Sequence, residues 1–290
     1  MLKFIHLTDL HITGTGETHE GYDTFAATQR AFRHAIDLFP DADFIVVTGD
    51  LANWGEPAAY RRLEEFFRTI DLPLFLMIGN HDNRENFFEV FGERHPFAMP
   101  FAQYGVDFDR YRLLFLDTQA IGTHGGTLCS RRLAWLEGEL AASNKDVLLF
   151  MHHHPVSFGA PSLDAKGMDN WPEFHRVLAR HRGRIRHIFH GHCHVAVQGN
   201  VEGISFSGIR SMGPQAYTDL KTDQACRQML EPHYVVALVD DTSLVTHAVE
   251  FNYAGPTLRR DRQKFSNFIQ ICAERGVTVP LQEPLKDTAE

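Results

Sequence analysis

Residues 44–53 have the sequence FIVVTGDLAN, in which four apolar residues run directly into a polar cluster. The short, continuously apolar stretch from Phe44 to Val47 is typical of a buried strand. The polar residues TGDLAN then end that pattern at once. The same arrangement recurs in four other stretches of the chain: LKFIHLTDLH at 2–11, LFLMIGNHD at 74–82, VLLFMHHH at 147–154 and IRHIFHGHCH at 185–194.

Helical patterns separate the first three of these apolar runs. Thr24 to Phe39 has apolar residues at helical spacing and stops at Pro40, and Pro57 suits the first turn of a helix that continues to about Ile70. The order β-α-β-α-β predicts an α/β fold, in which helices pack outside a sheet. The carboxyl ends of the strands line one edge of such a sheet, where ligands bind. We therefore expect the five polar clusters to converge in space.

Each polar cluster has an ordinary interpretation when it is taken alone. Asp9 and Asp50 could each cap a turn or a helix, and the three histidines at 152–154 could lie at the surface. Five such clusters at five strand ends are not explained in that way. Carboxylate, imidazole and amide oxygen form a ligand set that suits Mn²⁺, Fe, Zn²⁺ or Co²⁺ better than Mg²⁺ alone. The absence of thiolates from the clusters argues against a structural zinc site.

The motifs DxH, GDxxN, GNHD, a histidine near a proline, and GHxH occur in this order between residues 9 and 194. In this order they resemble the calcineurin-like metallophosphoesterase superfamily. Within it, the stretches FMHHHPVSFG, IFHGHCH and NYAGP are similar to glycerophosphodiesterases and class III cyclic-nucleotide phosphodiesterases. The resemblance implies an α/β sandwich of two β-sheets flanked by helices, with a small β-rich cap, and a site for two metal ions.

The resemblance also implies which residues hold the metals. Seven side chains from the polar clusters would do so: Asp9, His11 and His194 on one ion, Asn80, His152 and His192 on the other, and Asp50 as a bridge between them. A bridging carboxylate can hold two cations ~3.5–4 Å apart that share an activated water. The expected cofactors are two divalent or trivalent transition-metal ions, either Mn, Fe, Zn or Co.

The histidine triplet departs from the family pattern, which has two histidines followed by two prolines. An alignment without gaps from Phe150 and Met151 selects His152 as the ligand, whereas alignment on Pro155 would select His153. The gap-free alignment also matches the FG that follows. The sequence therefore favours His152.

Two further residues take roles from the resemblance. His81, in GNHD, would lie beside the phosphate and protonate the leaving alkoxide, since imidazole titrates near neutral pH. Asn53, in GDxxN, would orient the ligands and lie near the substrate. Asp50 and His81 would then be the catalytic residues. A hydroxide activated by both metals would attack phosphorus in line while His81 assists departure of the alcohol.

The leading hypothesis is a phosphodiesterase for small diesters, namely cyclic nucleotides such as cAMP, glycerophosphodiesters or both. A phosphomonoesterase or nuclease on the same scaffold is the alternative. A third hypothesis is a non-catalytic binding scaffold. Such relatives usually lose ligands or the GNHD histidine, whereas this chain keeps all seven ligands and His81, so the scaffold is disfavoured.

The composition limits the partners and the location. The formal net charge is −9, and no run of Lys and Arg exceeds a dipeptide, so the chain lacks the basic stripe of proteins that bind long nucleic acid. Four scattered cysteines without a C-x-x-C pair indicate reduced thiols. No charged leader with a long apolar region opens the sequence, and no apolar run reaches the ~18 residues that span a bilayer. We expect a cytoplasmic protein without membrane insertion.

We expect residues 1–290 to form a single metallophosphoesterase domain. Short β segments separated by glycines occur between residues 195 and 250, after the last motif. The corresponding region of the glycerophosphodiesterases that the chain resembles caps the active site and joins subunits, so the resemblance implies a small β-rich cap and dimer contact here, not more of the core sheet, and hence a homo-oligomer. Within it, Gly208–Gln228, with Arg210 and Tyr217, is the candidate for substrate selection beside the metals. The alternative for this segment is a surface hairpin. Weak helical character is expected around residues 262–274.

Overall fold

The computed structural model describes residues 1–256 and 267–278. Its contacts divide the chain into two compact units, Met1–Asn252 and Tyr253–Glu290, and the single domain over residues 1–290 stays a prediction. The second unit contains helix α8 (Phe268–Glu274), which matches part of the expected helical stretch. The remainder of that stretch, residues 262–266, lies outside the described residues.

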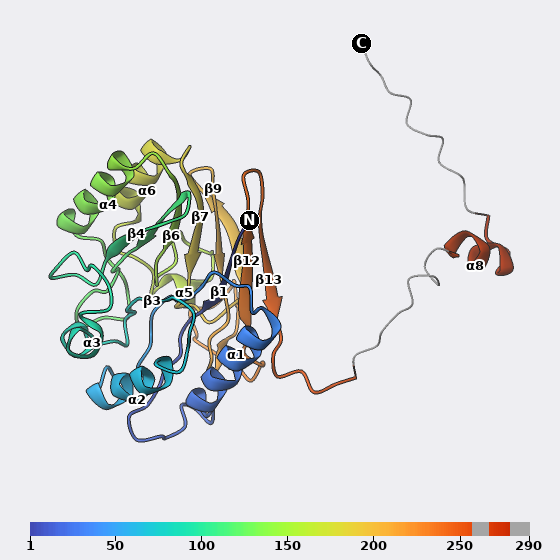
Figure 1. The fold of residues 1–290 in the computed structure, drawn as a ribbon, viewed down its shortest axis with the longest axis horizontal. Coiled ribbons are helices and arrows are strands. Elements are labelled where there is room, and N and C mark those ends of the chain that lie inside the picture. The colour runs from blue at the N-terminus through green and yellow to red at the C-terminus, as the bar shows by residue number, and fades with distance from the viewer. Residues whose placement is uncertain (257–266, 279–290) are drawn as a thin grey trace, which may run out of the picture. The chain divides into compact units, whose positions relative to one another are not determined.

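Two β-sheets form the centre of the first unit (Figure 1). One has the strand order β13-β12-β1-β2-β3 and consists of β1 (Leu2–Leu7), β2 (Phe44–Val47), β3 (Leu74–Leu76), β12 (Tyr234–Val239) and β13 (Leu244–Val249). The other has the order β4-β5-β6-β7-β9-β8 and consists of β4 (Tyr104–Phe108), β5 (Tyr111–Phe115), β6 (Asp146–Phe150), β7 (Ile185–His190), β8 (Val197–Val201) and β9 (Ile204–Gly208). The strands that precede the polar clusters run parallel to their neighbours, β1 to β2 to β3 and β6 to β7.

Aromatic side chains fill the layer between the two sheets. The ring of Phe4 in β1 lies 5.7 Å from that of Phe150 in β6 and 5.1 Å from that of Phe189 in β7, centroid to centroid. Because side chains alternate along a strand, Ile5 and Leu7 of β1 face the opposite way and join the core beneath the helices. Burial on both faces explains why these strands are rich in apolar residues.

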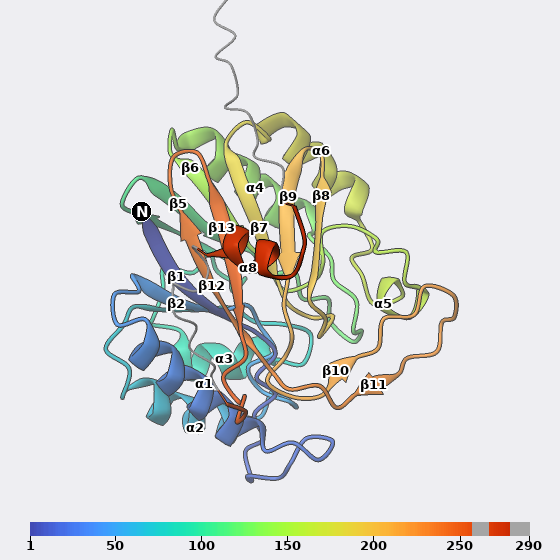
Figure 2. The same ribbon diagram turned by 90° about the vertical axis from the view of Figure 1, so that its right-hand side faces the viewer.

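Helices cover the outer faces of both sheets (Figures 1 and 2). Helices α1 (Thr24–Leu38), α2 (Pro57–Phe67) and α3 (Arg84–Phe91) share an apolar core with the sheet of β1, whereas α4 (Ser130–Ala142) and α6 (Trp171–His181) share one with the sheet of β7. A single-turn helix, α5 (Pro161–Asp164), precedes α6. This α/β sandwich confirms the fold class. Helix α3 is absent from the sequence prediction.

Residues 195–250 do not form a cap separate from the core, and the sequence prediction is wrong for four of their strands. Strands β8 and β9 extend the six-stranded sheet, and β12 pairs antiparallel with β1, placing Val236 opposite Ile5. These strands need partners for their apolar faces and backbone groups, and the edges of β1 and β7 supply them. The hairpin of β10 (Gln215–Ala216) and β11 (Arg227–Gln228) forms a small sheet of its own (Figure 2).

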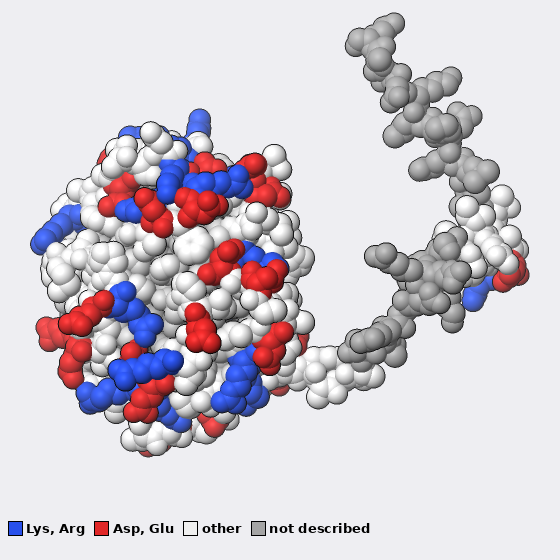
Figure 3. Space-filling model, viewed as in Figure 1, with Lys and Arg blue, Asp and Glu red and all other residues white. Residues whose placement is uncertain are grey.

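The surface is mixed in charge on the face that Figure 3 shows, where Lys and Arg are interspersed with Asp and Glu. This face carries no basic stripe, in keeping with the net charge of −9. Among residues 1–256 and 267–278, no helix combines the length and apolar character required to cross a membrane.

Candidate metal centre

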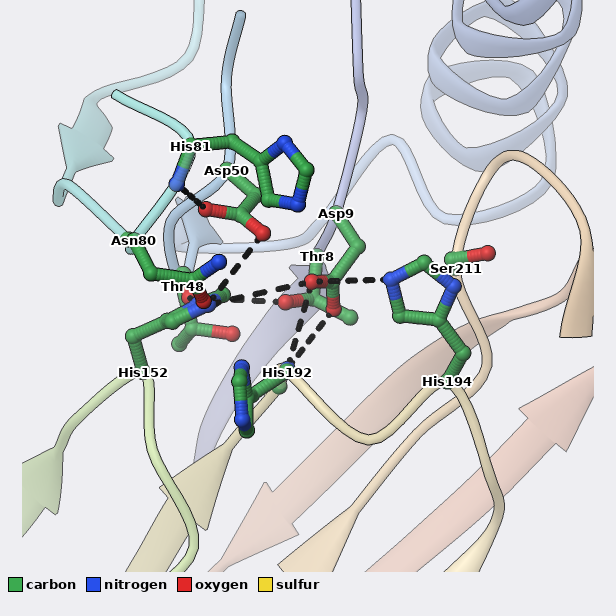
Figure 4. A network of polar contacts seen from close by, with 12 residues as sticks. Thr8, Asp9, Thr48, Asp50, Asn80, His81, His152, His192, His194 and Ser211 are labelled. Atoms are coloured by element: carbon green, nitrogen blue, oxygen red, sulfur yellow. Dashed lines mark hydrogen bonds and ion pairs between the residues drawn. The ribbon is translucent and has the colours of Figure 1, made fainter. Parts of the chain in front are cut away.

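The structure brings the predicted metal ligands together at the carboxyl edges of the two sheets (Figure 4): Asp9, His11, Asp50, His152 and His194 form close groups of ligand atoms, and Asn80 and His192 lie beside His152. They lie on the segments that follow β1, β2, β3, β6 and β7: Asp9 and His11, Asp50, Asn80, His152, and His192 and His194. Clusters that are far apart in sequence are therefore neighbours in space, as the parallel strand order predicts.

Five of these residues share a strained backbone conformation. Their φ angles are positive, in the left-handed region that residues other than glycine rarely adopt: Asp9 at 51°, His11 at 47°, Asp50 at 49°, His192 at 70° and His194 at 52°. Each such residue costs about 1–3 kcal/mol, and the surrounding contacts must hold it in place. The N–H of Asp9 donates to Gly49 O at 3.0 Å, and that of His11 donates to Asp50 O at 2.9 Å. Strain concentrated in this way is typical of a functional site.

The first cluster consists of Asp9, His11 and His194, whose ligand atoms all lie within 4.8 Å of one another. Nε2 of His194 lies 3.4 Å from Oδ1 of Asp9 and 3.1 Å from Nε2 of His11. All three side chains are buried. Two imidazole nitrogens that face each other beside a carboxylate form a compact set of donors for one metal ion.

The second cluster is centred on His152. Its Nε2 lies 3.4 Å from Oδ2 of Asp50 and 3.1 Å from Oδ1 of Asn80. The same Oδ2 of Asp50 lies 3.7 Å from Nε2 of His11 in the first cluster. One carboxylate oxygen is therefore within reach of both groups of donors.

Hydrogen bonds outside the clusters orient three of the imidazoles. The Nδ1 atom of His11 lies 3.1 Å from Asn53 Oδ1, that of His152 lies 2.8 Å from the carbonyl of residue 48, and that of His194 lies 2.7 Å from the carbonyl of residue 214. Because the oxygens of these partners can only accept here, each Nδ1 carries the proton and donates it. Each Nε2 then faces the centre of the site, where it is the ring nitrogen available to a metal ion. This arrangement is common in proteins where histidine binds a metal.

His192 is oriented in the opposite sense. Its Nε2 lies 2.8 Å from the carbonyl oxygen of Lys166 and donates to it, which leaves Nδ1 as the free donor atom. The His192 ring lies 5.1 Å from the His152 ring, centroid to centroid. The amide of Asn80 is fixed as well, since its Nδ2 lies 3.0 Å from Nδ1 of His124, so that its Oδ1 is the atom near His152.

The electrostatics of the clusters favour cations. Burial acts to raise the pKa of Asp9, but His194 and His152 outweigh burial and lower it to about 2. Burial likewise opposes ionisation of Asp50, yet His152 brings the pKa of Asp50 well below its ordinary value. Burial holds the pKa of His11 well below its ordinary value, so His11 is neutral and can act as a ligand. The residues present therefore fit a pair of metal ions.

His81 and Asn53 lie beside the ligands. A ring nitrogen of His81 is within 4.8 Å of the ligand atoms of His11 and Asp50, and its backbone N–H donates to Oδ1 of Asp50 at 2.8 Å. Its Nδ1 donates to the carbonyl oxygen of Asn53 at 2.9 Å. Asn53 thus holds both His81, through its backbone, and His11, through its side chain.

Of the three consecutive histidines, the structure places His152 in the cluster. Both ring nitrogens of His153 are occupied elsewhere, with Nδ1 2.7 Å from Thr118 Oγ1 and Nε2 3.2 Å from the carbonyl oxygen of His124. Nδ1 of His154 lies 3.2 Å from Sγ of Cys193. The gap-free alignment therefore selected the histidine that faces the other ligands.

The two substrate residues proposed from the segment Gly208–Gln228 do not line the cavity above the ligands. Arg210 donates to the carbonyl oxygen of Glu231 at 3.0 Å and forms an ion pair with Glu250 at 3.2 Å. The side chain of Tyr217 is exposed and also lies outside the cavity lining. Arg227 of β11, in the same segment, does line it.

The cavity has a volume of about 280 Å³, and its outer wall carries side chains that the sequence analysis did not identify: His19, Glu20, Trp54, His124, Lys166 and Arg227. His19, Glu20, His124 and Lys166 come from loops that follow no strand motif, Trp54 directly follows the cluster after β2, and Arg227 lies on β11. Lys166 and Arg227 add positive charge to the wall of the cavity, and Arg227 lies 3.6 Å from Glu20.

The calcineurin-like phosphoesterase family matches residues 2–196 of this chain. The chain belongs to this family, a class of metal-dependent hydrolases. The chain is 35% identical to a probable cyclic nucleotide phosphodiesterase of Rhodopseudomonas palustris, and the match covers 88% of this chain and 94% of that protein. A probable glycerophosphodiester phosphodiesterase GpdQ of Arcobacter nitrofigilis is 27% identical, covering 84% of this chain and 91% of the relative.

The chain is also 29% identical to the 3′,5′-cyclic adenosine monophosphate phosphodiesterase CpdA of Escherichia coli K12, over 67% of this chain and 70% of the relative. Among solved structures, a dimetal phosphatase from Danio rerio is similar with a TM-score of 0.61 and 14% identity, covering 86% of this chain and 96% of that one. At this identity the structural likeness shows the fold alone.

Proposed function

We propose that the protein hydrolyses small phosphodiesters, cyclic nucleotides such as cAMP and glycerophosphodiesters, with two metal ions bound in the clusters. One observation carries this proposal. The carboxylate of Asp50 lies within 3.7 Å of Nε2 of His11 and within 3.4 Å of Nε2 of His152, between two groups of potential metal ligands. The choice of diesters as substrates is supported by the relatives described above, which are named as cyclic nucleotide or glycerophosphodiester phosphodiesterases and which this chain matches over most of their length.

The proposed ligand sets follow the two clusters. Asp9, His11 and His194 would hold one ion, Asn80, His152 and His192 would hold the other, and Asp50 would be shared by both. Manganese, iron, zinc and cobalt all accept this mixture of carboxylate, imidazole and amide. When bound, the two ions neutralise phosphate charge and activate water as the nucleophile.

Other residues of the chain protonate the leaving group and hold the catalytic side chains in position. With Nδ1 bonded to the Asn53 carbonyl oxygen, His81 in its imidazolium form carries its second proton on Nε2 and can transfer that proton to the leaving alkoxide. Asn53 keeps the His81 and His11 rings in fixed orientations relative to each other. Lys166 and Arg227, on the cavity wall, attract the anionic substrate.

Two further parts of the proposal concern the location and the assembly of the protein. A cytoplasmic location accords with four free cysteines, Cys129, Cys193, Cys226 and Cys272. A homo-oligomer remains a prediction from the family resemblance, and light scattering on the purified protein tests it.

The test of the proposed function is a substrate panel. We would measure kcat/KM for 3′,5′-cAMP, 2′,3′-cAMP, glycerophosphocholine and the monoester 5′-AMP, with Mn²⁺ added and with a chelator. The proposal expects hydrolysis of at least one diester that exceeds monoester hydrolysis and stops with the chelator. Faster hydrolysis of the monoester would instead favour a phosphomonoesterase.

A further inference from the structure

Trp54 stands apart from the other tryptophans. Its side chain is 73% exposed, whereas Trp135 and Trp171 pack against the core beneath the six-stranded sheet. Among the described residues, the apolar core clusters do not include Trp54. A large aromatic side chain left in solvent gains nothing from burial in the fold, and its face is available to a ligand.

The exposed indole lies on the wall of the cavity above the metal ligands, which it lines together with Asp50, Asn80 and His81. It follows Asn53 directly, the residue that bonds both His11 and His81. The ring is therefore part of the same cavity in which the phosphate would be bound.

The backbone that carries the indole is held rigidly. The N–H of Trp54 donates to Oε2 of Glu56 at 3.2 Å, and the other oxygen of Glu56 accepts from Gly14 N at 2.7 Å. The next residue, Gly55, has φ +66°, and a Cβ there would lie 2.6 Å from Asn83 N. Its carbonyl oxygen accepts from Asn86 at 2.8 Å. A fixed backbone with a free ring provides a preorganised surface for binding.

We propose that Trp54 is the stacking surface for a planar nucleobase, and that it makes cyclic nucleotides better substrates than glycerophosphodiesters. This inference rests on the proposed function and names the substrate class for the same site. With the phosphate at the metal ligands, the ester substituent extends along the cavity wall. An indole face gains from stacking on a purine and gains little from a glycerol group.

The charged residues of the wall agree with this choice. Lys166 and Arg227 face the cavity with one carboxylate on the outer wall, Glu20, which pairs with Arg227. The excess of positive charge disfavours a cationic substituent such as choline, whereas a purine carries no charge at neutral pH. Both features therefore select the same class of diester.

The experiment compares wild-type protein with Trp54→Ala and Trp54→Phe, all loaded with Mn²⁺. Trp54→Ala raises KM for 3′,5′-cAMP by about 5- to 100-fold, the size of one base stacked on an aromatic side chain, and leaves KM for glycerophosphocholine within about twofold. Trp54→Phe keeps most of the affinity because it keeps an aromatic face. Leu38→Ala, an exposed apolar residue of α1 outside the cavity lining, is the matched control and changes neither KM.

A second readout needs no turnover. Binding of 5′-AMP should quench tryptophan fluorescence in wild-type protein, and Trp54→Phe should abolish the quenching, since Trp135 and Trp171 lie outside the cavity lining. Equal changes of KM for both diesters, or quenching that persists in Trp54→Phe, would overturn the inference while leaving a diesterase in place. A wild-type protein that hydrolyses no diester yet shows Trp54-dependent quenching would reject the proposed function and support a base-binding site.

Discussion

Oδ2 of Asp50 lies 3.4 Å from Nε2 of His152, at the point where the two donor clusters meet. The same oxygen is 3.7 Å from Nε2 of His11, so its removal affects both proposed metal sites. We expect Asp50→Ala to abolish diester hydrolysis and to reduce bound metal below one ion per chain. Elemental analysis of the purified variant, in parallel with activity, checks this.

Asp37→Ala is the control for that variant, because Asp37 is an exposed carboxylate on α1. It should retain wild-type metal content and activity. Two tightly bound ions in Asp50→Ala would reject the bridging role of Asp50 and leave the two clusters independent.

His152→Ala should lose metal and activity, whereas His153→Ala should keep its metal. The reason is geometric, since His152 directs Nε2 at Asp50 and Asn80 while His153 bonds Thr118 and the backbone of residue 124. Metal content per folded chain is the decisive measurement, because both histidines are buried and either change can reduce stability. If His153→Ala lost its metal and His152→Ala kept it, the metal ligand would be His153 and not His152.

His81→Ala should keep both metals and lower kcat by roughly 10²–10⁴, the usual contribution of a positioned acid or base. The loss should shrink for diesters whose leaving group is strongly acidic, because such an alkoxide departs without a proton. A series of aryl phosphodiesters of graded leaving-group pKa measures this. Equal losses across the series would argue for phosphate positioning instead of proton transfer.

Stability should fall in mild acid because of buried histidines. Burial lowers the pKa of His95 to about 3 and that of His187 to about 3, from an ordinary value of 6.5. Below pH 6.5 the unfolded chain binds protons at these sites, while the folded chain does not until about pH 3. Their contribution is therefore present above pH 6.5 and is lost as the pH falls, by about 1.4 kcal/mol per pH unit for each histidine.

Urea unfolding of metal-free protein between pH 6.5 and pH 5 tests this prediction. His95→Gln removes one titrating group, so its free energy of unfolding should decline less steeply than that of the wild type, by about 1.4 kcal/mol per pH unit. Parallel pH profiles for the two proteins would show that His95 is not held neutral by the fold.

The metal cluster was accessible from the sequence because its residues follow strands directly. An apolar run followed by DLH or GNHD predicts both a strand and the polar residue at its end. Because the strands are parallel, those ends lie at one edge of the sheet. Helix α3 left similar signals that were missed. Asn83 caps it by accepting from Asn86 N at 2.9 Å, and Phe87 and Phe91 are four residues apart.

Two features could not be predicted from such motifs: the pairing of β12 with β1, and the residues that form the cavity wall. Val236 lies opposite Ile5, a contact between the two ends of the first unit, and an apolar run does not specify which sheet edge it will join. His19 and Lys166, from loops, and Arg227, from the two-residue strand β11, reach the cavity from segments without a periodic pattern, so their positions depend on the completed fold.

The central claim is that Asp50 bridges two metal ions. Anomalous diffraction from crystals of the Mn²⁺-loaded protein tests it most directly. We predict two peaks about 3.5–4 Å apart, one beside Asp9, His11 and His194 and the other beside Asn80, His152 and His192, with the Asp50 carboxylate between them. A single peak, or two peaks of which only one contacts Asp50, would contradict the account.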